Sequence, residues 1–83
     1  MIDFYTWPGP NSRKAQIMLE EAGAEYTVRT VDITKGEQFA PAFLKISPNN
    51  KIPAIVDHTP TGPVAVFETA AILLYLAESS GRL

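Results

Sequence analysis

The 83-residue sequence contains no cysteine, which excludes disulfide scaffolds, thiolate metal sites and any thiol chemistry carried by the chain itself. No apolar run approaches the roughly 20 residues that a membrane-spanning helix needs, and residues 1–6 are too short for a secretion signal and contain no lysine or arginine. Seven lysines and arginines stand against nine acidic residues, a net charge of -2 that provides no basic footprint for nucleic acid. We therefore expect neither a nucleic-acid partner nor a membrane partner.

The composition is that of a folded chain, with 46% hydrophobic and 19% charged residues. A chain of 83 residues is long enough for one hydrophobic core and too short for two. The sequence therefore predicts one small domain that needs no covalent or metal staple.

The first part of the sequence alternates between strand and helix patterns. Residues 2–6 predict a strand, and residues 26–31 are β-branched and alternating, which predicts a second one. Between them, a helix capped by Asn11 or Ser12 is expected to run to about Gly23, which suits its C-cap. Its apolar stripe consists of Ala15, Met18, Leu19 and Ala22. A strand, a helix and a strand of this length predict a βαβ unit with parallel strands.

The second part predicts a short helix over residues 41–46 and a hairpin of two apolar strands, 52–57 and 64–67, joined by residues 58–63. A final helix is expected from about Glu68 to Ser80. The order β-α-β-α-β-β-α predicts an α/β class of fold, a four-stranded mixed sheet with helices on both faces.

The last helix has more apolar residues than one buried face requires. Residues 70–77 are eight apolar residues in succession and so cover every side of a helix. One interpretation is a central helix buried on two sides by its own domain. Because so short a chain has little left to cover a second side, we favour a partner: a further domain or another subunit.

Three segments carry groups that bind small molecules, and each also has an ordinary structural interpretation. Pro8–Ser12 leads into a helix N-terminus, where free amides favour an anion, although the residue types alone favour a plain strand-to-helix turn with an asparagine cap. At Ile52-Pro53 a cis bond would turn the Ile52 backbone outward, but most bonds that precede proline are trans. At Glu68-Thr69 a carboxylate beside a helix N-terminus suits an α-amino acid head group, although an ordinary capped helix is the alternative. All three lie at one end of the predicted sheet, where ligands of open α/β sheets bind.

The whole chain resembles the N-terminal, thioredoxin-like domain of cytosolic glutathione transferases. It is most similar to the bacterial nu-class branch, which reduces disulfides with glutathione. The motifs that carry the resemblance are Ile2-Asp3-Phe4-Tyr5, Pro10-Asn11, Gly36–Phe39, the specific run Ile46–His58, Phe67-Glu68 and Ala71–Glu78. The resemblance implies that residues 1–83 form this domain and that the C-terminal all-helical domain of the family is absent.

The resemblance also implies a site for glutathione as cosubstrate, with no metal, in a cytoplasmic protein. Pro53 would be the cis-proline, and the Ile52 backbone would pair with the cysteinyl part of the tripeptide. Glu68 and Thr69 would hold the γ-glutamyl end, and Lys51 would lie near the glycine carboxylate. The implied catalytic residues are Asn11 and Ser12 near the thiol, and Gln38 would line the same groove.

One departure from the family affects catalysis. The nearest branch has threonine two residues before its asparagine, where this chain has Gly9. The resemblance therefore implies a glutathione-binding half with weak or no transferase or disulfide-reductase activity. The alternative is a non-catalytic interaction module or an engineered minimal scaffold, which self-associates or binds a helical domain through residues 70–77. The lone His58 is expected to be a solvated loop residue.

Overall fold

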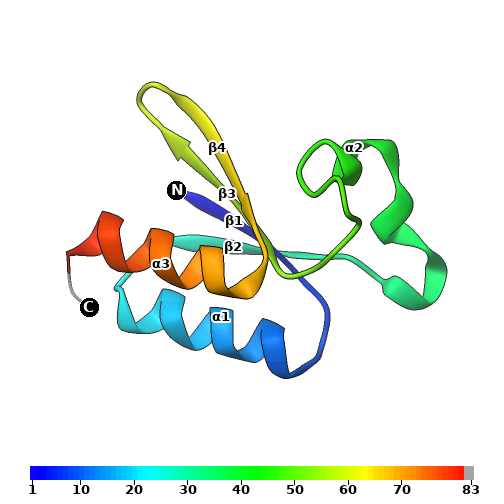
Figure 1. Cartoon of the computed structure of the whole chain (residues 1–83), viewed down its shortest axis with the longest axis horizontal. Coiled ribbons are helices and arrows are strands. Elements are labelled where there is room, and N and C mark those ends of the chain that lie inside the picture. The colour runs from blue at the N-terminus through cyan, green and yellow to red at the C-terminus, as the bar shows by residue number, and fades with distance from the viewer. Residues whose placement is uncertain (82–83) are drawn as a thin grey trace.

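The computed structural model describes residues 1–81, which form a four-stranded mixed sheet with helices on both faces (Figure 1). The elements are β1 (Ile2–Thr6), α1 (Pro10–Glu21), β2 (Tyr26–Thr30), α2 (Pro41–Leu44), β3 (Ala54–Thr59), β4 (Gly62–Phe67) and α3 (Thr69–Ser80). The strand order is β2-β1-β3-β4, with β1 and β2 parallel and the other pairs antiparallel. The predicted fold class and element order are confirmed.

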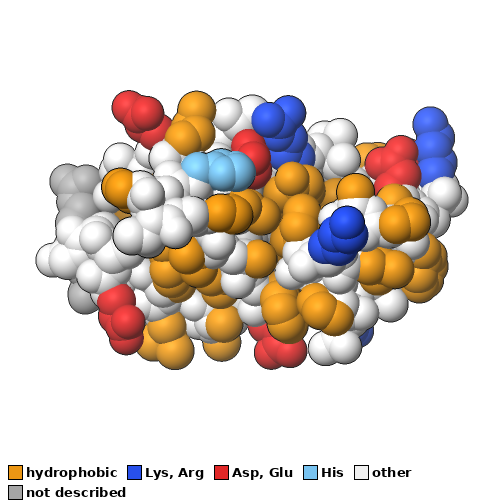
Figure 2. Space-filling model, turned by 90° about the horizontal axis from the view of Figure 1, so that it is seen from above, with side chains coloured by type: hydrophobic (Ala, Val, Ile, Leu, Met, Phe, Trp, Pro, Cys, Tyr) orange, Lys and Arg blue, Asp and Glu red, His pale blue; other side chains and the backbone are white. Residues whose placement is uncertain are grey.

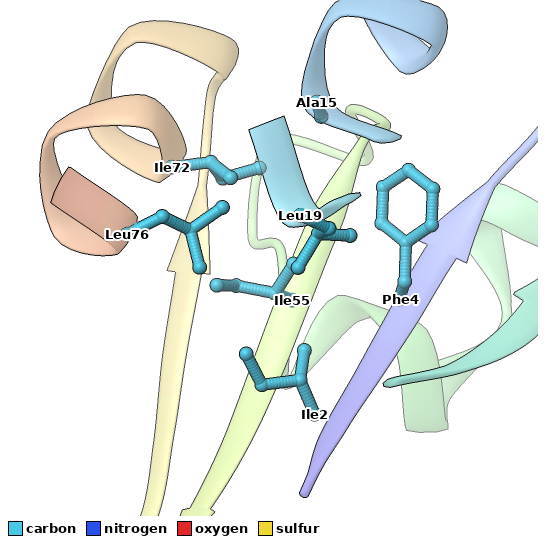
Figure 3. Packing of buried hydrophobic residues seen from close by; sticks show 7 residues of the cluster. All are labelled: Ile2, Phe4, Ala15, Leu19, Ile55, Ile72 and Leu76. Atoms are coloured by element: carbon cyan, nitrogen blue, oxygen red, sulfur yellow. The ribbon is translucent and has the colours of Figure 1, made fainter. Parts of the chain in front are cut away.

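Helices α1 and α3 lie side by side against one face of the sheet (Figure 1). Their contact encloses the larger core, in which side chains from both helices meet those of β1 and β3 (Figure 3). The predicted α1 stripe is confirmed, since Ala15 and Leu19 are completely buried there. Burying a large aliphatic or aromatic side chain contributes roughly 1.5–3 kcal/mol, so this layer supplies much of the stability. Its members are Ile2, Phe4, Ala15, Leu19, Ile55, Ile72 and Leu76.

The opposite face of the sheet is covered at one end by α2. Side chains alternate along β1, so Tyr5 points away from the larger core and its ring lies 5.8 Å from that of Phe43 on α2. Beyond α2 the face carries charged side chains, and Figure 2 shows the histidine among them. His58 lies in β3 rather than in a loop, and its Nε2 is 2.8 Å from Asp3 Oδ2. This hydrogen bond, with help from Arg29 and against the effect of burial, lowers the pKa of the Asp3 carboxyl.

Both ends of α1 follow from backbone preferences. The predicted cap at Asn11 or Ser12 is wrong, because the helix begins at Pro10 and Gly9 precedes it without a side-chain capping bond. Because the fixed φ of proline suits the first helical position, the helix begins at Pro10, before the expected capping residues. Gly23 ends the helix as predicted, with a left-handed φ of 68° and its N–H bonded to the Glu20 carbonyl.

The hairpin is longer and its turn tighter than the sequence indicated. Pairing continues to Thr59 opposite Gly62, so that Pro60 and Thr61 alone connect β3 to β4. The Thr59 hydroxyl donates to the Gly62 carbonyl at 2.6 Å, and Gly62 has a φ of 125°, which favours glycine. At its other end β3 begins at Ala54 rather than Ile52. The two short 3₁₀ turns at Ile33–Lys35 and Glu37–Phe39 were not predicted.

The apolar run of α3 is buried on one side. Ile72 and Leu76 face the core, whereas Leu74 is 66% exposed and Ala70 and Ala71 are exposed too. The interpretation of a helix buried on two sides by its own domain is therefore wrong. Ile17 of α1 is also 55% exposed, so each of the two paired helices leaves an apolar side chain uncovered.

A hydrogen bond from Tyr75 to Asp57 joins α3 to β3. The Tyr75 hydroxyl donates to Asp57 Oδ2 at 2.5 Å, in a partly buried position. Since the bond requires the protonated phenol and the carboxylate repels a phenolate, it raises the pKa of Tyr75 from 10.0 to about 12. A group whose pKa is higher in the folded state stabilises the protein fully below its unfolded pKa. That stabilisation is lost as the pH rises toward 12.

We expect Tyr75→Phe to lower the free energy of unfolding at neutral pH by about 1–2 kcal/mol, because it removes a hydrogen bond to a charged acceptor. It should also flatten the loss of stability between pH 10 and about 12. Urea unfolding followed by circular dichroism across this range measures both effects. Tyr26→Phe is the matched control, since the Tyr26 hydroxyl makes an exposed bond to Glu20. An unchanged alkaline loss in Tyr75→Phe would contradict the assignment.

Candidate glutathione site

Three segments that are distant in the sequence leave the sheet at the same end of its strands, which we call the edge. Tyr5 of β1 pairs with Ala54 at the start of β3, and Ala54 pairs with Phe67 at the end of β4. The loop after β1, the Ile52-Pro53 segment and the Glu68-Thr69 segment therefore lie at the same edge. Their convergence follows from the register and was predicted from the order of the strands.

The Ile52 backbone has an unused donor and an unused acceptor at this edge. Neither its N–H nor its carbonyl has a hydrogen-bond partner among residues 1–81, although Ile52 is only half-buried beside the buried Pro53. The Ile52-Pro53 peptide bond is cis. An extended ligand can pair with both backbone groups as an additional strand pairs with a sheet edge.

Glu68 and Thr69 form the start of α3. Thr69 is the first helical residue, which is one of the two positions expected for it, and Glu68 precedes it without a side-chain capping bond. The first internal bond of the helix runs from the Ile72 N–H to the Glu68 carbonyl, which leaves the preceding amides of the first turn free for an anion. The Glu68 carboxylate is exposed beside these amides. The free amides can therefore bind a carboxylate of a ligand, and the Glu68 carboxylate can bind an ammonium.

The backbone at Glu68 is strained. Its φ of 72° with ψ of 133° lies in a region that residues with a Cβ rarely adopt. Such conformations cost roughly 1–3 kcal/mol and are found most often where a ligand is bound. The strain turns the chain from β4 into α3 within one residue, so the carboxylate and the helix N-terminus stay adjacent.

The structure separates the two residues that the resemblance made catalytic. Asn11 is exposed in the first turn of α1, where Pro10 has no N–H and the amides of Asn11 and Ser12 are free. Ser12 is 6% exposed and borders a cavity of about 650 Å³ on the β2 side of the loop, lined also by Trp7, Arg13 and Thr30. Ile52, Glu68 and Thr69 do not line this cavity. Asn11 is thus exposed to solvent, whereas Ser12 borders a space that Ile52, Glu68 and Thr69 do not line.

Trp7 and Arg13 were not selected from the sequence. In the sequence, Trp7 directly follows the predicted strand over residues 2–6, and Arg13 lies outside the apolar stripe of the helix that follows. Only the packing of the loop against the end of β2 makes them walls of one cavity.

Lys51 directly precedes Ile52, whereas Gln38 makes no hydrogen bond to Ile52, Glu68 or Thr69 in the described part of the chain. Lys51 is exposed and makes no ion pair within residues 1–81, so its ammonium is free for an anionic ligand group. Gln38 lies in the second 3₁₀ turn, where Nε2 donates to the Ile33 carbonyl at 3.5 Å. Its Oε1 is buried and has no partner.

Within residues 1–81, no three histidine, aspartate or glutamate side chains come together as metal ligands would. The helices of the same range are all too short or too polar to cross a bilayer.

Known proteins resemble the chain over nearly its entire length. A family model described as the glutathione S-transferase N-terminal domain matches residues 2–78. The disulfide-bond oxidoreductase YfcG of Escherichia coli K12 is 57% identical over 84 residues, which cover 98% of this chain and 39% of YfcG. The chain therefore spans about two fifths of that relative.

Solved structures agree with this relationship. A glutathione transferase family member from Pseudomonas fluorescens, solved with two glutathione molecules bound, superposes with a TM-score of 0.92 at 51% identity, over 99% of this chain and 37% of that one. A glutathione transferase from Pseudomonas putida, with one glutathione disulfide bound per subunit, superposes with a TM-score of 0.91 at 46% identity, over 99% and 36% of the two chains. The expected resemblance is confirmed: this chain belongs to the glutathione S-transferase family, as its thioredoxin-like N-terminal domain.

Proposed function

We propose that this chain binds glutathione along the edge where β1, β3 and β4 end, and that alone it turns the tripeptide over weakly or not at all. The observation that carries the proposal is the unpaired backbone of Ile52 beside the free N-terminus of α3. Glutathione is a short extended peptide with an α-amino acid at one end, and these two features complement its two parts. The glutathione-bound relatives, which share the fold over the whole chain, support the choice of ligand.

Each part of the tripeptide is assigned to a different group. The Ile52 N–H and carbonyl pair with the cysteinyl unit, next to Pro53. Thr69 and the first-turn amides of α3 bind the γ-glutamyl carboxylate, while Glu68 accepts from the ammonium. Lys51 neutralises the glycine carboxylate, and Gln38 is assigned to the same groove from the resemblance alone, since its Oε1 is buried.

The proposed chemistry belongs to the bound thiol, because the chain has no cysteine. Its thiolate attacks one sulfur of a disulfide, a mixed disulfide forms, and the other sulfur leaves as thiolate. This reaction requires reduced glutathione, which is why we place the protein in the cytoplasm.

Activation of the thiol limits this chemistry. Lowering a thiol pKa from about 8.5 to about 6.5 requires roughly 2.7 kcal/mol of preferential thiolate stabilisation. A helix N-terminus supplies about 0.3–1 kcal/mol, and up to about 2 in favourable geometry. A donor at Asn11 must therefore add a hydrogen bond of about 1.5–3 kcal/mol to the thiolate. Ser12 is a weaker candidate for this donor, because it faces the separate cavity.

A second role is suggested by the uncovered apolar side of α1 and α3. Leu74 and Ile17 are 66% and 55% exposed, on two helices that pack against each other, and exposed apolar groups on neighbouring elements are typical of interaction surfaces. We propose that a helical domain covers this side in a longer protein and that two copies of the isolated chain associate through it. The chain then also acts as an interaction module, natural or engineered, and peptide binding does not interfere with this.

We expect glutathione to shift the backbone amide resonances of Ile52 and Thr69 with a dissociation constant in the millimolar range. Glu68→Gln should weaken binding about fivefold, because it removes the charge that faces the ammonium from an exposed position. A two-dimensional NMR titration measures both. Glu78→Gln removes an exposed charge elsewhere on α3 and should leave the affinity unchanged. Absence of shifts at Ile52 and Thr69 up to tens of millimolar glutathione would overturn the proposed function.

We expect Gly9→Thr to lower the pKa of the bound thiol by about 1–2 units, because the hydroxyl adds a hydrogen bond to the thiolate. The backbone accepts this change: Gly9 is extended at φ 166°, and an added Cβ meets its nearest atom, the Trp7 carbonyl oxygen, at 4.0 Å. Ultraviolet absorbance of the thiolate as a function of pH, at saturating glutathione, reads out the pKa. Gly9→Val has nearly the same shape without the hydroxyl, and an equal effect in both variants would refute the hydrogen bond.

We expect the isolated chain to self-associate at high concentration and Leu74→Glu to render it monomeric, since the new charge cannot be buried in an apolar contact. Sedimentation velocity over a range of concentrations, with binding of a hydrophobic dye as a second readout, tests this. Val64→Glu, at a 39% exposed position on the hairpin, is the control. A monomeric wild-type chain that binds no dye is the contradicting result.

A further inference from the structure

Ser47 is a completely buried polar residue in the connection between α2 and β3. Its side chain is 0% exposed, and its backbone N–H donates to the Phe43 carbonyl on α2 at 2.9 Å. Phe43 is itself 5% exposed and packs in the smaller core. Ser47 is thus attached to the rigid part of the domain, although it belongs to a loop.

The next residues of the loop are held by Ser47 rather than by their own packing. The Ser47 carbonyl accepts the N–H of Asn50 at 2.9 Å, and its Oγ accepts the N–H of Lys51 at 3.2 Å. Pro48 and Asn49 are exposed, and Asn50 adopts a left-handed φ of 50°. Two successive amides therefore depend on one buried residue for their orientation.

The second of these bonds orients the residues at the proposed glutathione site. It holds the N–H of Lys51, the residue that precedes Ile52 and carries the free ammonium. Without it, the peptide unit between Asn50 and Lys51 can rotate, and both the ammonium and the unpaired Ile52 backbone change direction with it. The hydroxyl of Ser47 is the only side-chain group seen to bond this unit within residues 1–81.

We infer that Ser47 is a positioning residue for tripeptide binding, which acts through Lys51 and Ile52 without touching the ligand; the inference rests on the proposed function. Its contribution is the fraction of molecules whose turn has the conformation that binds. When only a fraction f is competent, the apparent dissociation constant rises by 1/f. If the turn is competent one tenth of the time, the protein binds the ligand about tenfold more weakly, which corresponds to a loss of about 1.4 kcal/mol in binding free energy.

The test compares Ser47→Ala with the wild-type chain in two measurements. Hydrogen exchange of the Lys51 amide in the free protein reports the turn itself, and the dissociation constant of glutathione by NMR titration reports binding. We expect faster exchange at Lys51 and a dissociation constant about three- to tenfold higher. Thr59→Val is the matched control, because it deletes a side-chain hydrogen bond to the backbone at the far end of β3. Thr59→Val should lower the free energy of unfolding without changing the affinity, and Ser47→Ala would give the same result if Ser47 had a merely structural role.

A second pair of variants tests the turn without altering a buried side chain. Asn50 has a φ of 50°, a left-handed conformation that asparagine tolerates better than alanine does, so Asn50→Ala should weaken binding as Ser47→Ala does. Glycine adopts this conformation without steric cost, so Asn50→Gly should bind at least as well as Asn50→Ala. If the wild-type chain binds glutathione and Ser47→Ala binds it equally well, the inference is wrong while the proposed function stands. Where Ser47→Ala does not fold, Asn50→Ala takes its place in this comparison. If the wild-type chain does not bind, the proposed function fails, and the inference fails with it.

Discussion

The central position of β3 is the constraint on which the rest of the domain depends. This strand pairs with β1 on one side and β4 on the other, through Ala54 opposite both Tyr5 and Phe67. Ala54 and Ile55 are completely buried, and their side chains enter the two separate cores on opposite faces of the sheet. A shift of one residue would exchange these faces, so burial specifies the register strongly. The same register gathers the ends of three segments at one edge.

That edge differs from the rest of the molecule in how its polar groups are treated. Away from this edge, side chains such as Asp3 and Asp57 have partners. At the edge, the Ile52 backbone has no partner among the described residues 1–81, and Glu68 occupies a strained conformation. Both are unfavourable in the free domain and become favourable when a ligand supplies the missing groups. The proposed glutathione site is therefore the place where the fold leaves its interactions incomplete.

The second incomplete surface is the outer side of α1 and α3, and its physical basis is different. There the uncovered groups are apolar, so the missing component is a hydrophobic partner instead of a polar ligand. The relatives are more than twice as long as this chain, which fits a domain that normally has a neighbour. The two surfaces involve different ends of α3: its first turn belongs to the ligand edge, and Leu74 lies further along.

The sequence alone determined the element order, the family and the core stripe of α1, because hydrophobic periodicity and the Ile46–His58 motif are local in the chain. It placed the cap of α1 wrongly, because Asn11 and Ser12 are residue types that often cap helices, whereas the structure has Pro10 at the first helical position. Only the tertiary structure decided that Ser12 borders a separate cavity, that Ser47 holds the loop before Ile52, and that one side of α3 remains uncovered. The reason is physical: burial and hydrogen bonding of these residues depend on neighbours far away in the sequence, which no local pattern specifies.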